Sequence, residues 1–193
     1  PYYIVQIYYA NGQYDKVYEL AEELLRNYPD NDYNDELHRL VGEIYYQKGI
    51  YNDAVRHLKA YHQLRDKKKK EMVQNDLYLL GISCYKEKMY KDAVTYLKQI
   101  KQIPGDSISE STCLHLGHCY LYEKDLEKAK NSYKAAIEFR INEQLREEAM
   151  YNLVQVTYLQ NSALGENITA FKQFINEYPQ SKYIDKVYSL MAD

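Results

Sequence analysis

Two cysteines and two histidines fall within one short stretch, Cys113-Leu-His115-Leu-Gly-His118-Cys119, and these are side chains that bind zinc. On a helix, His115, His118 and Cys119 would fall within about 100° of one another, which leaves a fourth ligand position open. No carboxylate follows at a matching spacing, and Gly117 fits a packing pattern described below. We therefore expect buried structural side chains here, with no metal and no cofactor.

Other signals of catalysis are missing from the sequence. It contains no glycine-rich phosphate loop, no nucleophile elbow and no His-Glu metalloprotease motif. Its carboxylates follow regular polar helix faces, which do not supply the pocket that a catalytic constellation needs. A third cysteine, Cys84, leaves an odd number that cannot close a disulfide framework, so the cysteines are interpreted as small buried hydrophobes. We expect no enzyme activity.

Charge and composition narrow the class of partner. The chain has 25 Lys and Arg against 28 Asp and Glu, a net charge of −3, which provides no basic field for nucleic acid. No apolar run approaches the roughly 18 residues of a membrane span. The 24 tyrosines, with no tryptophan and 3 phenylalanines, suit half-buried positions and contact surfaces. We expect a protein or peptide partner, no nucleic acid and no membrane span.

The elements that position these residues recur along the chain. Segments 42–61, 81–100 and 117–136 align without a gap, a further copy lies upstream at 5–24, and a looser one lies at 154–174. A period of 36 to 39 residues is marked by the turn residues Tyr14, Tyr51, Tyr90, Leu126 and Leu164. Self-similarity at such a period is the signature of stacked helical units. The charge run at 66–71 is interpreted as a solvated linker between two copies.

Each copy predicts two antiparallel helices joined by a short polar turn. Apolar residues such as Ala54, Leu58 and Tyr61 recur at i, i+4 and i+7, which is one stripe of a helix. A glycine inside the first helix costs about 1 kcal/mol relative to alanine, so it needs a packing reason. We expect small residues to face each other and to let the helices approach, in the pairs Gly42 with Ala54, Gly81 with Ala93, and Gly117 with Ala129.

This pattern, Leu-Gly-x-x-Tyr/Cys, then a turn aromatic, then Ala-x-x-x-Leu/Tyr, resembles the tetratricopeptide repeat. Residues 80–84 and 116–120 follow it best, whereas the early Trp of the family is absent and Val5 and Val154 replace glycine. The resemblance covers essentially the whole chain. It implies an all-α, α-α superhelix of about five helix-turn-helix repeats and a non-enzymatic scaffold that binds a partner on its concave face.

The repeats are expected at about 1–33, 34–72, 73–108, 109–145 and 146–182, with 183–193 beginning another. Both ends fall inside an amphipathic pattern, so we expect a single array that is a fragment of a longer protein.

Two segments carry a narrower resemblance. The stretches YPDNDY (28–33) and YPQSKY (178–183) are similar to the YP-x-S-x-Y repeat variant of bacterial cell-envelope proteins. That variant occurs in BamD-like outer-membrane assembly lipoproteins and in long repeat proteins of the Bacteroidetes type. The resemblance implies a periplasmic or outer-membrane association.

A second face of the first helices carries the candidate binding residues. About 120° from the packing face lie Tyr78, Ile82 and Tyr85, bulky side chains at i, i+4 and i+7. The matching positions of the other copies add the candidates Tyr9, Arg39, Tyr46, His118, Tyr151, Gln155 and Tyr158.

One of these positions holds Tyr9, Tyr46, Tyr85 and Tyr158, with Leu121 in the fourth copy, and we call this set the Tyr ladder. Tyrosine rings give contact area at a low entropy cost, which suits an extended or helical polypeptide. The alternative is that the rings only pack against the next repeat. A clamp for a terminal carboxylate is not expected, because only Arg39 has suitable chemistry.

Three functions therefore remain open. The favoured one is a protein-binding scaffold within an envelope-associated bacterial protein. In the second, the array is the regulatory module of a larger enzyme. In the third, arrays join through apolar surface at their ends and form an assembly.

Overall fold

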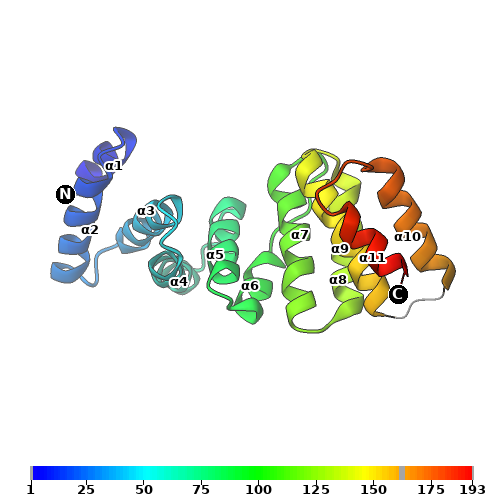
Figure 1. Ribbon diagram of the computed structural model, residues 1–193. Coiled ribbons are helices and arrows are strands. Elements are labelled where there is room, and N and C mark those ends of the chain that lie inside the picture. Colours follow the sequence, from blue (N-terminus) through cyan, green and yellow to red (C-terminus); the bar gives the residue numbers. More distant parts are fainter. Residues whose placement is uncertain (1, 161–163, 193) are drawn as a thin grey trace. The chain divides into compact units, whose positions relative to one another are not determined.

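The computed structural model describes residues 2–160 and 164–192, and every regular element in this part of the chain is an α-helix. The chain divides into two compact units, Pro1–Gln99 and Ile100–Asp193. Each unit is a row of antiparallel helix pairs (Figure 1). The first helix of each pair carries the candidate binding residues named above.

The first unit contains three helix pairs. They are α1 (Tyr2–Ala10) with α2 (Tyr14–Asn27), α3 (Asn34–Gln47) with α4 (Tyr51–Lys67), and α5 (Gln74–Lys86) with α6 (Tyr90–Leu97). The first helices α1, α3 and α5 contact one another in sequence, so their faces form one surface within this unit.

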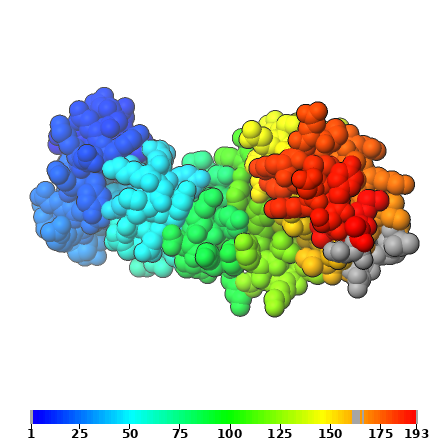
Figure 2. Space-filling view, in the orientation of Figure 1, coloured from blue at the N-terminus to red at the C-terminus, as the bar shows by residue number. Residues whose placement is uncertain are grey.

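The second unit contains two pairs and one further helix. They are α7 (Ser107–Tyr122) with α8 (Leu126–Phe139), α9 (Glu143–Leu159) with α10 (Leu164–Glu177), and α11 (Ile184–Ala192). Helix α9 contacts α7, α8, α10 and α11, and in Figure 2 the red atoms of α11 lie in front of part of it. The predicted helical pairs are thus confirmed, and Pro29 and Pro179 each follow the end of a second helix.

The turn inside a pair has the same geometry in four repeats. Gly49 has φ of +72°, its N–H donates to Tyr46 O at 3.0 Å, and the N–H of Ile50 donates to Tyr45 O at 2.9 Å. These two bonds define a Schellman motif, which needs a residue in the left-handed region after the helix. The left-handed position is held by Gly12, Gly49, Lys88 and Lys124.

The helix glycines are buried at the contact within each pair, as predicted, but their partners differ from the prediction. A Cβ added to Gly81 would lie 2.5 Å from Leu97 Cδ2, and one added to Gly42 would lie 2.7 Å from Leu58 Cγ. At Gly117 the nearest atom is Cε1 of Tyr133, at 2.5 Å. Each glycine therefore makes room for a large side chain one turn beyond the expected Ala54, Ala93 or Ala129, which are themselves fully buried.

Buried acids at the start of first helices tie each pair to the loop that leaves it. Glu110 is 0% exposed, and its carboxylate accepts hydrogen bonds from the backbone N–H of Ile141 at 3.1 Å and Asn142 at 3.0 Å. At the matching place in α3, Asp35 accepts from Lys68 Nζ at 2.8 Å. The charge run at 66–71 is therefore not simply a solvated linker, because Lys68 is anchored and α4 continues to Lys67.

Candidate protein-binding surface

The Tyr ladder residues of the first unit each pack on the turn tyrosine of their own repeat. Ring centroids are 5.8 Å apart for Tyr9 and Tyr14, 5.8 Å for Tyr46 and Tyr51, and 6.1 Å for Tyr85 and Tyr90. The turn tyrosine is the first residue of the second helix, so each ladder ring is braced from one side. Tyr9, Tyr46 and Tyr85 are half-buried.

A tyrosine of the next repeat also lies near one of these rings. The pKa of Tyr46 is raised to about 12, first by burial and then by the nearby hydroxyls of Tyr78 and Tyr51. Tyr78 is half-buried, whereas Ile82 is only 3% exposed and lies within the core of the first unit. The candidate surface in α5 therefore consists of Tyr78 and Tyr85.

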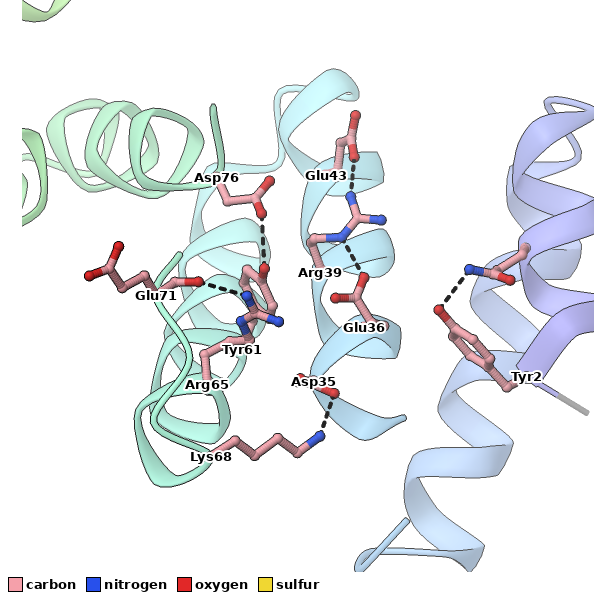
Figure 3. A network of polar contacts seen from close by, with 11 residues as sticks. Tyr2, Asp35, Glu36, Arg39, Glu43, Tyr61, Arg65, Lys68, Glu71 and Asp76 are labelled. Atoms are coloured by element: carbon pink, nitrogen blue, oxygen red, sulfur yellow. Dashed lines mark hydrogen bonds and ion pairs between the residues drawn. The ribbon is translucent and has the colours of Figure 1, made fainter. Parts of the chain in front are cut away.

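Arg39 does not present a free cation. Its Nε lies 2.8 Å from Glu36 Oε2 and its Nη1 lies 3.3 Å from Glu43 Oε2, both on the same helix (Figure 3). The carboxylate of Asp76 also acts on the guanidinium from α5 and helps to raise the pKa of Arg39. Three acids around one cation leave this face of the first unit acidic.

Tyrosine hydroxyls complete this polar network. The hydroxyl of Tyr61 donates to Asp76 Oδ2 at 3.0 Å in a buried position, and Figure 3 shows the two side chains pointing toward each other. Burial raises the pKa of the Asp76 carboxyl. The pKa of Tyr9 is also raised, by burial and then by a hydrogen bond to Glu43. The network joins α1, α3, α4 and α5.

In the second unit, His118 is held by polar neighbours from the next first helix. Its Nε2 lies 3.4 Å from Glu148 Oε1 and 3.4 Å from Asn152 Nδ2. Leu121 and Tyr158 are partly buried and pack against the hydrophobic core of this unit. These three residues share the equivalent face of α7 and α9.

Tyr151 and Gln155 are used mainly for internal contacts. Tyr151 is 7% exposed, its ring is stacked on Tyr183 with centroids 4.2 Å apart, and Gln155 Nε2 donates to its hydroxyl at 2.8 Å. The first unit repeats this arrangement. The rings of Tyr2 and Tyr33 are stacked with centroids 4.4 Å apart, and the hydroxyl of Tyr2 accepts a hydrogen bond from Gln6 Nε2 at 2.7 Å.

These stacks explain the YP-x-S-x-Y pattern physically. The proline follows a second helix that has just ended, and the Ser or Asn three residues after the first tyrosine accepts the N–H of the last tyrosine. The bonds are Tyr33 N–H to Asn31 Oδ1 at 2.9 Å and Tyr183 N–H to Ser181 Oγ at 3.0 Å. The last ring is thereby directed onto the preceding first helix. Sequence reasoning missed this pairing, although the pattern was visible.

The metal interpretation of residues 113–119 finds no support in the geometry. Cys84, Cys113 and Cys119 are buried and form no disulfide in the part of the chain that the structure describes, and burial raises the pKa of Cys84 to about 12. His115 Nδ1 lies 2.7 Å from the carbonyl oxygen of Ser111 on its own helix. Among residues 2–160 and 164–192, no group of three or more His, Cys, Asp or Glu side chains is arranged to hold a metal ion.

Comparison with known proteins shows the fold. No protein-family model and no curated protein matches the chain. Among solved structures it is similar to YrrB, a TPR protein with an unusual peptide-binding site, with 14% identity, 96% of this chain and 88% of that chain covered, and a TM-score of 0.75. It is also similar to MamA, with 18% identity, 98% and 95% covered, and a TM-score of 0.65.

A third similar structure is a tetratricopeptide repeat protein from Parabacteroides merdae, with 14% identity, 97% of this chain and 71% of that chain covered, and a TM-score of 0.65. These likenesses confirm the predicted fold class, an all-α superhelix of the tetratricopeptide type. In the part of the chain that the structure describes, no helix is both long enough and apolar enough to cross a membrane.

Proposed function

We propose that this chain is a non-enzymatic scaffold that binds a protein or peptide along the Tyr ladder face of its first helices. The observation that carries the proposal is the recurrence of Tyr9, Tyr46 and Tyr85 at one helix position, each half-buried and braced by the turn tyrosine of its own repeat. A pre-positioned ring loses little conformational freedom on binding, so its contact area favours association.

The charges beside the ladder specify the partner further. In the first unit, the guanidinium of Arg39 lies among three carboxylates, those of Glu36, Glu43 and Asp76. A partner segment that carries Lys or Arg beside apolar side chains complements both the carboxylates and the rings. Replacing Glu43 by Gln should weaken binding of such a basic segment and reduce the salt dependence of the association rate.

The ladder is tested by replacing Tyr46, Tyr85 and Tyr158 together by Ala. We expect loss of partner capture in pull-downs with the full-length protein, while circular dichroism shows unchanged helix content. A control variant replaces Tyr3, Tyr122 and Tyr188, which are 65%, 61% and 51% exposed and lie outside the ladder. Undiminished capture by the ladder variant, or equal loss in both variants, contradicts the proposal.

Association with a bacterial envelope is a further part of this proposal. It is supported by the resemblance of residues 28–33 and 178–183 to the YP-x-S-x-Y variant and by the stacking that this pattern produces. Fractionation of cells that express the full-length protein tests it, because recovery only in the cytoplasmic fraction contradicts an envelope location.

A second candidate function is assembly of this chain with further copies. It is favoured by apolar side chains exposed on α1 and α11: Ile4 is 46% exposed, Ile7 57% and Met191 48%. A second copy that stacks α1 against α11 would cover them. Sedimentation over a range of concentrations separates the two functions. Assembly predicts that the apparent mass of the protein rises with its concentration and that Ile7→Lys lowers this mass. If the chain only binds a partner through the Tyr ladder, the protein alone stays a monomer.

A further inference from the structure

A cleft on the opposite side of the first unit has the properties of a ligand site. It has a volume of about 490 Å³, opens between the second helices α2 and α4, and is floored by α3. Three cationic side chains, Arg26, Arg56 and Lys67, line it together with the carboxylate of Glu22, and Arg56 is also paired with Asp53 at 3.2 Å. Because cations outnumber acids, the cleft favours an anion.

A buried acceptor in this cleft is left for a ligand. Asn34 is 4% exposed, and its Nδ2 donates to the carbonyl oxygens of Tyr28 and Pro29, each at 2.8 Å. Two acceptors on the same nitrogen fix the orientation of the amide. Oδ1 is buried without a hydrogen-bond partner among the residues that the structure describes, and an acceptor in that state requires a donor.

A histidine pair forms another part of the wall. His38 Nδ1 lies 3.0 Å from His57 Nδ1, and His57 Nε2 lies 3.3 Å from Glu22 Oε1. If His38 Nδ1–H donates to His57 Nδ1, the proton of neutral His57 is on Nε2. Neither His57 Nε2 nor Glu22 Oε1 has a hydrogen-bond partner among the residues that the structure describes. The pKa of His57 is lowered to about 3 by burial, His38 and Arg56, so the pair is neutral near pH 7 and contributes hydrogen bonds without charge.

The ligand must therefore combine negative charge for the three cations with an O–H or N–H donor for the acceptors Asn34 Oδ1 and Glu22. Hydrogen phosphate does so, because it has charged oxygens and a hydroxyl on one phosphorus atom. Sulfate at neutral pH has the charge but no donor. We propose that this cleft is a binding site for a protonated phosphate group, and that the buried acceptors discriminate phosphate from sulfate. The proposal is independent of the Tyr ladder.

Two sources of that group differ in their pH dependence. Inorganic phosphate keeps a hydroxyl at pH 7.5, whereas a phosphate monoester has a second pKa of about 6 and becomes a dianion without a donor above it. A monoester should therefore bind at pH 5.5 and lose affinity at pH 7.5. The monoester probe is methyl phosphate, which has no hydroxyl outside the phosphate group. Binding of methyl phosphate at pH 5.5 assigns the site to phosphorylated molecules, and its failure to bind at both pH values assigns the site to the free anion.

The test is calorimetric titration of the chain with potassium phosphate and potassium sulfate at constant ionic strength and pH 7.5. We expect phosphate to bind and sulfate to bind at least about tenfold more weakly, because it leaves a buried acceptor unpaired. Glu22→Gln should reduce the ratio of phosphate affinity to sulfate affinity, because it replaces a carboxylate by an amide that can donate a hydrogen bond to sulfate. Equal affinity for the two anions, or binding of neither, overturns the proposal.

Variants locate the site. Arg26 and Lys67 are exposed, so the double variant Arg26→Gln and Lys67→Gln should keep its helix content and lose phosphate affinity by about tenfold or more. The matched control, Lys91→Gln with Lys98→Gln, removes the same charge from exposed positions of the first unit outside the cleft and should bind normally. Equal weakening in both variants shows a general charge effect and contradicts the site.

Discussion

The ring of Tyr183 lies flat on the ring of Tyr151, with centroids 4.2 Å apart and planes inclined by 6°. This stack joins the loop before α11 to α9. Replacing Tyr183 by Ala should destabilise the second unit by about 2 kcal/mol through lost apolar burial and stacking. Tyr183→Phe keeps the stack and should change stability little. Urea unfolding measures both, and Tyr188→Ala on the exposed face of α11 is the control.

The glycines of the first helices differ from the glycine of α10. Gly81→Ala would place a methyl group 2.5 Å from Leu97 Cδ2, so we expect a loss of about 1–3 kcal/mol from overpacking. A methyl group added to Gly165 meets nothing within 4 Å, so Gly165→Ala should stabilise α10 by up to about 1 kcal/mol. Opposite shifts of the thermal midpoint check this, and shifts of equal sign contradict it.

In the turns inside two repeats, a lysine occupies a backbone conformation that suits glycine. Lys88 and Lys124 have φ of +60° and +62° in turns where Gly12 and Gly49 serve two other repeats. The left-handed conformation costs a side chain about 1–2 kcal/mol, so Lys88→Gly should stabilise the first unit by about 0.5–1 kcal/mol, after allowance for the greater entropy of unfolded glycine.

Lys86→Gly, at the last residue of α5, is the matched control for Lys88→Gly. It should destabilise by up to about 1 kcal/mol, because its backbone is helical. Chemical denaturation measures both variants, and a destabilised Lys88→Gly protein contradicts the prediction.

The histidine pair predicts an acid-sensitive first unit. The pKa of His57 is about 3 in the folded chain and about 6.5 when unfolded, so the unfolded state binds more protons below pH 6.5. Stability should therefore fall as the pH decreases from about 6.5 toward 3. His57→Gln should flatten this slope, whereas His62→Gln on the same helix should not. Thermal midpoints between pH 4 and 7.5 measure the slopes, and parallel slopes for His57→Gln and wild type contradict the prediction.

Repetition made the fold predictable from the sequence. Each apolar stripe, turn residue and helix-ending proline occurs several times, so Tyr14, Tyr51 and Tyr90 could be identified as the starts of second helices. The partners of the glycines were assigned to Ala54, Ala93 and Ala129 because spacing alone does not fix the vertical register of two helices. The structure shifts the contact by one turn, to Leu58, Leu97 and Tyr133.

The candidate site was less predictable. Helical spacing predicts that Tyr46 and Tyr85 share one face, but it could not show that Ile82 and Tyr151 are buried by neighbours distant in sequence. The pairing of Arg39 with Glu36 and Glu43 was visible as i, i+3 and i, i+4 spacing. The anchoring of Lys68 by Asp35 was not visible, because the two residues lie 33 positions apart in the sequence.

Each glycine in a first helix is matched by a large side chain sixteen positions later in the same repeat, a leucine in two repeats and a tyrosine in the third. Duplication of one repeat in the gene therefore copies both members of the fit together. A chain of this kind can lengthen during evolution without new adjustments inside any pair. Only the residues between neighbouring pairs then have to adapt.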